Sequence, residues 1–325
     1  MAARVLVTGG AGYIGSFCAR ALMAAGYEVV VVDDLSSGHP EAVDCRLVEL
    51  DLRDRAGLGR LLGEGFDGVV HLAGLIGVGE SFDEPGRYLD VNVRGSLSLL
   101  DAMREHGVAC LVFSSTCALY APSEEPLDED VALAPSSPYA ETKLLTERAI
   151  GLGRRQGLRA YCLRYFNAAG AAEDGSLGEA HAPETHLIPI AIERASRGRP
   201  LTVFGDDYPT PDGTCVRDYI HVLDLAEAHV RAMERLLAGA PGEALNLGTG
   251  RGASVRDIAA LVSRCLGRAL ELEPGPRRRG DQPSLVARAT RATRSLDWSP
   301  RRGLDEIIAS ACAWHRAPRY GPGTA

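Results

Sequence analysis

Lysine is almost absent from this sequence. Lys143 is the single lysine, and the other members of the 35 basic residues are arginines. Arginine carries a wide planar fork, whereas lysine carries a compact ammonium on a flexible stem. A chain that uses arginine for its other basic roles is expected to keep a lysine where the arginine fork would not fit. Lys143 is therefore a candidate for a specific chemical role.

The sequence also lacks long apolar runs, paired cysteines and an excess of positive charge. No apolar stretch approaches the ~20 residues that a membrane span needs. The eight cysteines are scattered without a C-x-x-C pair or a zinc-site spacing with histidine, which is typical of buried thiols in a reducing cytosol. The net charge of −8 argues against a nucleic-acid or membrane-surface partner. We therefore expect a cytoplasmic protein with no metal site, no nucleic-acid partner and no membrane partner.

Short apolar runs alternate with helical patterns in the first half of the chain. At 325 residues and 46% apolar content, the chain can bury a sizeable core. The runs are continuous rather than alternating, as expected of strands buried on both faces of a parallel sheet. They cover residues 5–7, 29–32, 45–50, 68–72, 110–113 and 161–166. Helices are expected between them at 13–25 and 86–106, each ending before a glycine.

A glycine motif directly follows the first predicted strand and opens the first predicted helix. Its spacing is Gly9-x-x-Gly12-x-x-Gly15. This spacing lets the backbone turn sharply, approach a pyrophosphate and pack the helix against the sheet. The helix starts at Tyr13 and Ile14, where free N–H groups and the positive end of the helix dipole face the anion. The motif predicts a dinucleotide site.

The ends of the next two strands carry acidic residues. Asp33 would accept hydrogen bonds from the adenosine ribose, and Asp34 beside it would repel a 2′-phosphate, so NAD is favoured over NADP. Asp51 and Leu52 end the third strand and are placed to meet the adenine. A helix N-cap at Asp51 is an equally good interpretation.

The second half of the chain has a different pattern. Helices are expected near 188–197, 222–238, 254–266 and 303–315, with strands at 201–204 and 243–247. We therefore expect an α/β protein with a Rossmann-type doubly wound parallel sheet and a smaller C-terminal α/β substrate domain. The NAD-binding domain would span residues 1–167, with a segment around 215–250 returning to it, and the substrate domain would span 168–325.

The single lysine stands one helical turn after Tyr139. Ser137 and Pro138 are typical of a helix start, which places Tyr139 and Lys143 on one face. A cation at ~4 Å is worth roughly 4 kcal/mol, which is enough to lower the tyrosine pKa from near 10 by about 3 units. Lys143 would thus keep a phenolate available as a base, and it can also donate to ribose hydroxyls. The alternative is a surface pair with no chemical role.

Three hydroxyl residues end the strand before this helix, namely Ser114, Ser115 and Thr116. The carboxyl edge of an open α/β sheet is where ligands bind. Thr116 is the natural second hydrogen-bond partner for a substrate oxygen.

Together these motifs resemble those of the extended short-chain dehydrogenase/reductase superfamily. The second half is more specific, and nearly the whole chain, roughly residues 3 to 316, resembles the UDP-glucose 4-epimerase family. The resemblance rests on TGGAGYIG (8–15), the Tyr139/Lys143 pair, RYFN (164–167), THLIP (185–189), residues 203–230, ALNLGTG (244–250) and RRRGD (277–281).

The resemblance implies an NAD-dependent isomerase that interconverts UDP-glucose and UDP-galactose through a 4-keto sugar. Thr116 and Tyr139 would hold and deprotonate the sugar 4-hydroxyl, and Lys143 would support the phenolate. Further cofactor contacts are implied at Leu72, Ala73, Gly74, Asn92, Ser114, Ser115 and Tyr165.

The resemblance also implies a UDP-sugar site in the second half. Because the sugar must turn over during the reaction, the binding energy has to come from the remote nucleotide. Arg217 and Arg278 would clamp the diphosphate, although ion pairs with nearby acidic residues are the alternative for Arg217 and the arginines of 277–279. The other implied contacts are Asn167 at the diphosphate or sugar, Leu187 and Phe204 at the uridine, Asp281 at its ribose, Leu285 beside the sugar, and His186 and Tyr219 elsewhere on the substrate.

Four positions depart from the family pattern. Ile76 stands where relatives often have a lysine, His186 where some have asparagine, and Arg288 where an acidic residue is common. Leu285 stands where a tyrosine excludes N-acetyl sugars, so UDP-GlcNAc and UDP-GalNAc are a second candidate substrate pair.

The same residues bear on other functions. A sugar-nucleotide 4,6-dehydratase needs an acid and a base just after Thr116, and Cys117 and Ala118 are neither. A UDP-pentose or UDP-uronate epimerase remains an alternative, and a non-enzymatic NAD sensor is a further one. The family also implies a homodimer through helices 86–106 and 138–156.

Overall fold

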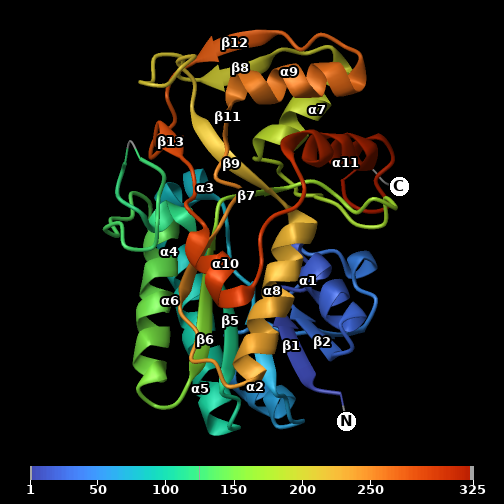
Figure 1. Ribbon diagram of the computed structural model, residues 1–325. Coiled ribbons are helices and arrows are strands. Elements are labelled where there is room, and N and C mark those ends of the chain that lie inside the picture. The colour runs from blue at the N-terminus through green and yellow to red at the C-terminus, as the bar shows by residue number, and fades with distance from the viewer. Residues whose placement is uncertain (1, 124, 323–325) are drawn as a thin grey trace.

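Seven strands form the large sheet in the computed structural model, which describes residues 2–123 and 125–322 (Figure 1). Their order is β10-β6-β5-β4-β1-β2-β3, and every neighbouring pair is parallel. This is the Rossmann-type doubly wound order, extended by one strand. The predicted fold class is confirmed. The strands are β1 Arg4–Thr8, β2 Glu28–Asp33, β3 Arg46–Glu49, β4 Gly68–His71, β5 Cys110–Thr116, β6 Arg159–Tyr165 and β10 Ala244–Leu247.

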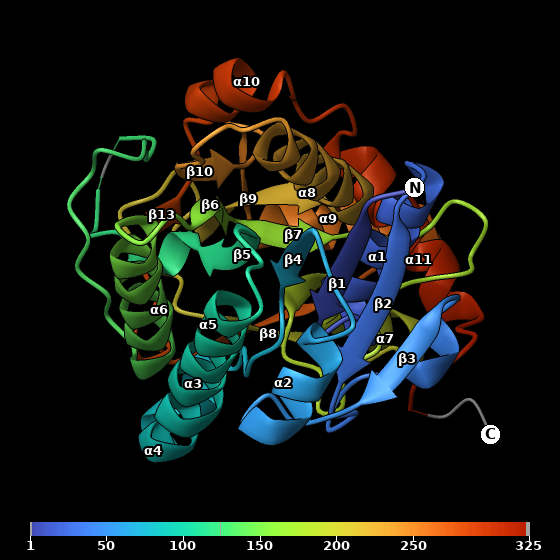
Figure 2. The same ribbon diagram turned by 90° about the horizontal axis from the view of Figure 1, so that it is seen from below.

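Helices cover both faces of this sheet (Figure 2). On β1, Val5 and Val7 pack in one apolar cluster with residues of α1 and α8, whereas Leu6 packs in another with residues of α2, α5 and α6. Successive side chains of a strand point to opposite faces, so a strand covered on both sides must be apolar throughout. The helices are α1 Tyr13–Ala24, α2 Arg55–Leu62, α5 Gly95–Glu105, α6 Pro138–Arg154 and α8 Val222–Leu237.

The helix predicted over 86–106 is interrupted. It consists of α4 Pro85–Tyr88, a π-helical segment η2 Leu89–Arg94, and α5. Asn92 lies in the π-helical segment and binds the backbone of Leu75 through both ends of its amide, at 2.7 and 3.0 Å. π-Helical turns are rare and are often found at functional sites. The regular spacing of apolar residues gave no signal for this interruption. Nor were α2 and α3 Val78–Asp83 predicted.

A smaller lobe stands over the carboxyl end of the large sheet (Figure 1). Its central strand is β9, which pairs with β7, β11 and β13, and a separate parallel pair joins β8 to β12. Helices α7, α9 and α11 pack around a separate apolar core. The elements are β7 Asn167–Ala169, α7 Leu187–Arg197, β8 Leu201–Phe204, β9 Val216–His221, β11 Gly252–Ser254, α9 Val255–Leu266, β12 Leu272–Gly275, β13 Ser284–Leu285 and α11 Leu304–Arg316. Helix α10 Thr290–Leu296 packs instead on β10 and α8 of the large lobe. Short 3₁₀ turns, η1 Pro40–Ala42 and η3 Cys117–Leu119, lie in the first half of the chain.

Strand β9 was not predicted because its sequence is polar. Asp218 in its middle is fully buried, and its carboxylate accepts hydrogen bonds from the backbone of Thr249, Gly250 and Ala287 at 2.9 to 3.1 Å. A buried carboxylate is tolerated when several N–H groups bind it. Asp218 thus holds two segments that are distant in sequence, one at 249–250 and one at 287, against strand β9.

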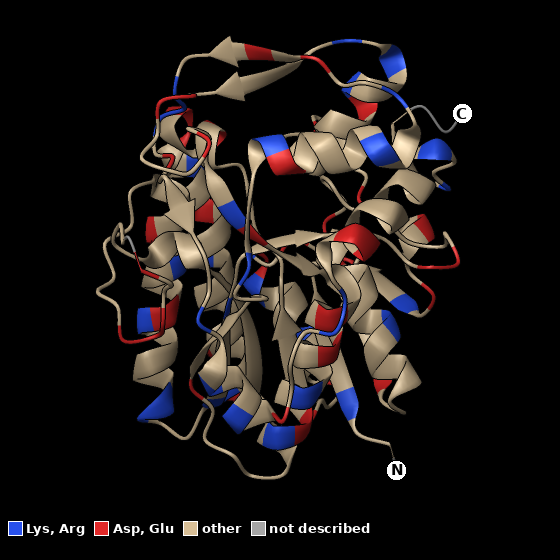
Figure 3. Cartoon of the chain, turned by 45° about the horizontal axis from the view of Figure 1, so that its top comes forward, with Lys and Arg blue, Asp and Glu red and all other residues tan. Residues whose placement is uncertain are grey.

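Acidic and basic residues are mixed over the helices and loops (Figure 3). Many arginines form ion pairs near the surface, such as Arg46 with Glu64 at 2.6 Å and Arg20 with Asp44 at 2.7 Å. Among the described residues, no helix is both long and apolar enough to cross a bilayer.

One ion pair is buried between α6 and the sheet. Arg164 on β6 and Glu147 on α6 have exposed side-chain fractions of 6% and 9%, and they meet at 2.6 Å. The same carboxylate accepts a hydrogen bond from the Ser115 hydroxyl on β5. Glu147 therefore joins the helix that carries Tyr139 to two strands of the sheet.

Breaking this pair from one side should cost more than removing both partners. We expect Glu147→Leu to lower the free energy of unfolding by about 3–5 kcal/mol, because it leaves a buried guanidinium unpaired. The double variant Glu147→Leu/Arg164→Met should recover most of this loss. Urea unfolding of both variants measures the difference, and equal loss in the two would contradict the role of the pair.

Candidate active site

The glycine loop after β1 packs against the loop after β4. Strands β1 and β4 are neighbours in the sheet, and the segments that follow them run to opposite faces of it. Open α/β sheets bind their ligands at such a point. Gly9 has φ +68°, and a Cβ on it would lie 2.6 Å from the backbone N of Ala73. A Cβ on Gly15 would lie 2.0 Å from the carbonyl oxygen of Gly9. Both positions therefore require glycine, and the loop lies directly against Leu72 and Ala73.

The start of α1 and the end of β2 complete this loop. Gly12 is the N-cap of α1 and supplies no side-chain hydrogen bond to the first turn, which begins at Tyr13. Asp33 is buried, and its carboxylate accepts hydrogen bonds from the backbone N–H groups of Ala11 at 3.0 Å and Leu35 at 2.9 Å. Burial raises the pKa of Asp33, and these two bonds oppose the shift. A glycine cradle, an uncapped helix start and a fixed carboxylate are together what a dinucleotide requires.

The neighbouring acidic residues are engaged differently. Asp34 is exposed and accepts a hydrogen bond from the backbone of Ser36 at 3.0 Å. Asp51 accepts from the guanidinium of Arg53, which lowers the pKa of Asp51. The alternative interpretation of Asp51 as a helix N-cap is wrong, because Asp54 caps α2. Leu52 and Ile14 are half-buried.

The loop after β4 is held by Asn92. Besides its bonds to Leu75, the amide nitrogen of Asn92 donates to Thr142 on α6 at 3.1 Å. A Cβ on Gly74, which has φ +154°, would lie 3.0 Å from the Asn92 oxygen. Asn92 thus links the loop after β4, which faces the glycine loop, to Thr142, the neighbour of Lys143.

Helix α6 begins as the sequence predicted, with Ser137 accepting a hydrogen bond from the N–H of Ala140 and with Pro138 in its first turn. Lys143 is 4% exposed, and its Nζ donates to the carbonyl oxygen of Ser114 at 3.0 Å. Nζ also lies 5.1 Å from the centre of the Phe113 ring. The alternative of a surface pair is therefore excluded.

Burial shifts both groups toward their neutral forms. The pKa of Lys143 falls to about 8 because its ammonium is desolvated. Burial raises the pKa of Tyr139 to about 12, and a hydrogen bond with Thr116 opposes this shift. The sequence led us to expect the opposite direction for Tyr139. The reason for the difference is that the Lys143 ammonium is directed at the Ser114 carbonyl and the phenol is largely desolvated.

The three hydroxyls at the end of β5 have different partners. Ser114 is hydrogen-bonded to the phenol of Tyr165, and Ser115 donates to Glu147. Thr116 caps the short turn η3 by accepting from the N–H of Ala118 at 3.1 Å, so its own proton can still be donated. Of the three, Thr116 is the one that reaches the Tyr139 phenol.

Polar residues of the small lobe gather on β9 and the loop before β13. The guanidinium of Arg217 donates to the backbone oxygens of Val216 at 2.9 Å and Gln282 at 2.8 Å, and lies 3.4 Å from Asp281. These contacts orient Arg217 without neutralising it fully. Asn167 on β7 lies opposite Tyr219 on β9.

The three arginines at 277–279 each contact a different partner. Arg278 stacks on the ring of Phe204 at 3.9 Å, and Arg279 stacks on Phe82 at 4.3 Å. Arg277 pairs with Asp207 at 2.7 Å, so the ion-pair alternative holds for this residue. The structure therefore brings Arg278 and Phe204 together.

The loop that follows this cluster reaches back to the first lobe. A Cβ on Gly280 would lie 3.4 Å from the Phe82 ring and 3.9 Å from the carbonyl oxygen of Ser136, just before α6. Leu285 is 9% exposed and shares an apolar cluster with Cys117, the neighbour of Thr116. Residues predicted for the sugar are thus close to those predicted for the chemistry.

His186 is engaged in a cluster that the sequence analysis did not predict. It precedes Leu187, the first residue of α7, and its Nδ1 lies 2.8 Å from Glu179 and 2.9 Å from Glu184. His181 belongs to the same cluster. Burial acts to lower the pKa of both histidines, but the carboxylates more than offset it and raise the values to about 9 for His181 and about 10 for His186. The available signal was the spacing Glu-x-His-x-x-Glu-x-His in residues 179–186.

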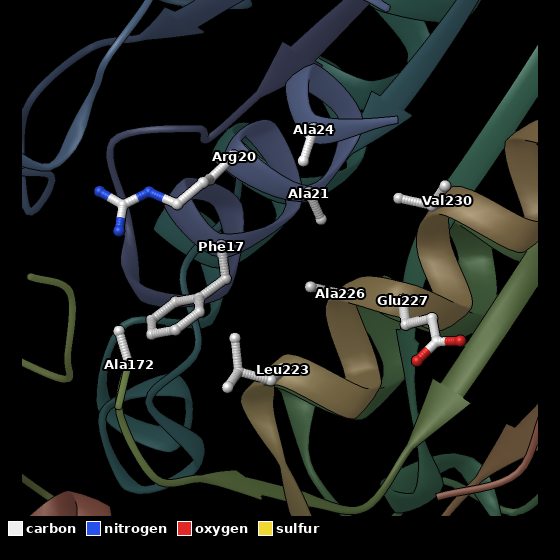
Figure 4. Close-up of a pocket in the computed structure, with 9 residues that line it drawn as sticks. All are labelled: Phe17, Arg20, Ala21, Ala24, Ala172, Leu223, Ala226, Glu227 and Val230. Atoms are coloured by element: carbon white, nitrogen blue, oxygen red, sulfur yellow. The ribbon is translucent and has the colours of Figure 1, made fainter. Parts of the chain in front are cut away.

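A separate hollow lies between α1 and α8 (Figure 4). Its lining is mostly apolar and includes Phe17, Ala21, Leu223 and Val230, with a volume of about 290 Å³. None of the residues that line it is among the predicted site residues, so it is distinct from the site described above.

Comparison with known proteins agrees with this geometry. The sequence profile of the NAD dependent epimerase/dehydratase family matches residues 5–248. The chain is 47% identical over 322 residues to the UDP-glucose 4-epimerase of Rhizobium meliloti, with 98% of each chain covered. The crystal structure of UDP-glucose 4-epimerase from Brucella ovis in complex with NAD matches with a TM-score of 0.93 at 46% identity, covering 96% of this chain and 98% of that one.

A third relative is named for two sugars. The UDP-Glc/GlcNAc 4-epimerase from Campylobacter jejuni matches with a TM-score of 0.84 at 35% identity, covering 97% of this chain and 99% of that one. These matches extend over both lobes. The chain therefore belongs to the NAD dependent epimerase/dehydratase family.

Proposed function

We propose that this chain interconverts UDP-glucose and UDP-galactose by NAD-dependent epimerisation at C4 of the sugar. The observation that carries the proposal is the arrangement of Thr116, Tyr139 and the buried Lys143 at the edge of the sheet that also bears the glycine loop. Relatives named UDP-glucose 4-epimerase cover nearly the whole chain.

NAD would be held across the carboxyl edge of the large sheet. Bound NAD supplies a hydride acceptor that takes hydrogen from a carbinol carbon and returns it, and its oxidised ring adds positive charge that favours a phenolate. The glycine loop and the start of α1 would bind the pyrophosphate, and Asp33 the ribose. The other proposed contacts are Asp34, Asp51, Leu52, Leu72, Ala73, Gly74, Asn92, Ser114, Ser115, Tyr139, Lys143 and Tyr165.

Tyr139 would take the proton of the sugar 4-hydroxyl and return it after the keto sugar has turned over. Its raised pKa means that the free phenol is neutral near pH 7. Lys143, whose pKa of about 8 keeps it mainly protonated at that pH, would stabilise the phenolate as it forms. Thr116 would donate a hydrogen bond to the same substrate oxygen and keep it in reach of Tyr139.

The nucleotide would be gripped by the small lobe. Arg217 and Arg278 present guanidinium groups that suit phosphate oxygens, and charge-assisted bonds of this kind are strong. Asp281 would bind the ribose. The sugar itself needs few contacts, because it must rotate between the two hydride transfers. Remaining proposed contacts are Asn167, His186, Leu187, Phe204, Tyr219 and Leu285.

UDP-GlcNAc and UDP-GalNAc form a second candidate substrate pair. Leu285 packs beside Cys117, next to Thr116, and is smaller than tyrosine. The Campylobacter jejuni relative is itself named for both UDP-Glc and UDP-GlcNAc. UDP-pentoses and UDP-uronates share the chemistry at C4 and remain further alternatives.

We also propose that the two lobes bind different ligands. Residues 1–167 would bind NAD, and 168–325 would bind the UDP-sugar, except for a returning segment. Helix α8 packs on α1, and β10 pairs with β6, whereas β9 belongs to the small sheet. This supports a returning segment that starts at α8 and ends near residue 250.

The compartment we propose is the cytosol. All eight cysteines are free thiols, and six of them are buried. Free thiols persist in a reducing compartment. Fractionation of the source cells, with the protein found in the cytosolic fraction, checks this assignment.

Purified protein with NAD should convert UDP-galactose into UDP-glucose. Tyr139→Phe should lower turnover by roughly 10²–10⁴-fold, since it removes the general base. Tyr27→Phe, outside the site, is the matched control and should retain activity. Parallel assays with UDP-GalNAc, UDP-arabinose and UDP-galacturonate define the substrate range by chromatography of the products. Turnover of none of the four sugars would favour an NAD sensor instead.

Lys143→Met should stabilise the cofactor-free protein while it abolishes turnover. The pKa of Lys143 falls from 10.5 to about 8, so the buried ammonium destabilises the native state below pH 8. The penalty is roughly 3 kcal/mol there and disappears as the pH approaches the unfolded-state value. Urea unfolding at pH 7 and pH 9.5 should therefore show a stability gain that shrinks at the higher pH. Tyr139→Phe, which keeps the lysine, is the control and should retain the wild-type rise between these values.

A homodimer through α5 and α6 is the proposed assembly. The large apolar side chains of Leu97 on α5, Leu89 before it and Leu152 on α6 are exposed in the single chain. Burial of such residues in a second copy would be favourable. We expect a dimer in sedimentation equilibrium, and Leu97→Glu should shift it toward monomer. Arg235→Glu on α8 is a control on the other face of the sheet, and a monomeric wild type would contradict the assignment.

A further inference from the structure

Four side chains of one loop converge outside the proposed chemistry. They are Glu179, His181, Glu184 and His186, and one donor atom from each lies within 4.8 Å of all the others. They sit between β7 and α7, on the segment that leads into the small lobe. Of the four, His186 alone is also a proposed substrate contact, and the proposed epimerisation assigns the cluster no common role.

The donor atoms of this cluster are nearly as close together as the ligands of a metal ion. Glu179 Oε1 lies 3.2 Å from Nδ1 of His181 and 2.8 Å from Nδ1 of His186, and Glu184 lies 2.9 Å from the latter. Donors around tetrahedral Zn²⁺, with bonds of about 2.0–2.2 Å, are roughly 3.3–3.6 Å apart. A small inward or outward adjustment of the side chains would therefore suffice.

One atom in the cluster has no ordinary partner. Among the residues that the structure describes, Nδ1 of His181 is buried without a hydrogen-bond partner of regular geometry, although it faces Glu179. A buried ring nitrogen of this kind normally finds a partner. A metal cation bound by the lone pair of this nitrogen would be such a partner.

The charges of the cluster also suit a divalent cation. Two carboxylates balance one M²⁺ ion. Each histidine would release its proton to solvent when the metal binds, and the two neutral imidazoles would complete four ligands of the oxygen and nitrogen type that Zn²⁺ accepts. Glu184 is held for this role, because its Oε1 accepts the backbone N–H groups of Thr185 and His186 at 2.8 Å each and leaves Oε2 toward His181.

We propose that Glu179, His181, Glu184 and His186 bind one divalent transition-metal ion, with Zn²⁺ as the best fit, and that this ion has a structural role. The surroundings support a structural role. The ring of Tyr13 at the start of α1 meets His181 edge-on at 6.3 Å, and the indole of Trp314 on α11 donates to the backbone oxygen of Glu179 at 2.8 Å.

The ion would therefore fix the junction of three elements. It would hold the loop at 179–186 against α1, which carries the glycine loop, and against α11 of the small lobe. Because His186 directly precedes α7, the ion would also set the position of the helix start at Leu187. Structural metal sites contribute directly to folding stability.

The first test measures metal in the full-length protein. Protein purified without chelator should contain about one Zn²⁺ per chain by plasma mass spectrometry or bind it on addition. Chelation should lower the unfolding temperature by several degrees, and Zn²⁺ should restore it. Replacement by Co²⁺ should produce the visible absorption bands of a tetrahedral nitrogen and oxygen site. Each of these readouts uses the wild-type chain, so none depends on activity or on a variant that folds.

The second test uses variants. His181→Gln and His186→Gln should each weaken Zn²⁺ binding by roughly 100-fold or more, since loss of even a supporting residue costs 10–100-fold. His106→Gln, an exposed histidine elsewhere, is the matched control and should bind as the wild type does. The rival interpretation is an ion-pair network of two protonated histidines and two carboxylates. That network is favoured, and the metal site overturned, if the wild type binds Zn²⁺ and Co²⁺ no better than the variants and chelation leaves its unfolding temperature unchanged.

Discussion

The burial of one ammonium against a backbone carbonyl organises the site. Lys143 donates to the Ser114 oxygen from inside the protein, so the end of β5 and the middle of α6 are fixed relative to each other. The same desolvation that lowers the pKa of Lys143 raises that of Tyr139. The protein therefore holds its proposed acid–base pair in two unfavourable environments. A positively charged group bound beside Tyr139 would lower the pKa of its phenol, which links the proposed chemistry to cofactor binding.

The supporting structure keeps this pair in place from several sides. Glu147 joins α6 to β5 and β6 through a buried ion pair and the Ser115 hydroxyl. Asn92 joins α6 to the loop after β4, which in turn lies against the glycine loop. Each contact uses a different strand end. Because parallel strands end at one edge of the sheet, residues far apart in sequence become neighbours there.

The use of arginine and lysine follows from the same geometry. Arginines such as Arg217 and Arg278 lie where a wide fork can bind backbone oxygens or stack on a ring. The space beside Ser114 lies under Phe113 and admits a narrow stem with a single charged end. A guanidinium in that place would need partners for five donors, and the strand end offers few.

The parallel sheet, the glycine loop and the helix start at Ser137 could be predicted from the sequence, because each depends on local periodicity, backbone freedom or capping. Local spacing also placed Tyr139 and Lys143 on one helix and Thr116 at a strand end, as the structure shows. Three features depend on the packing of the folded chain: the direction of the Tyr139 pKa shift, the interruption of the helix at Asn92 and the convergence of Glu179 with His186. Desolvation and contacts between distant segments depend on how the chain packs as a whole, and no local pattern of residues records them.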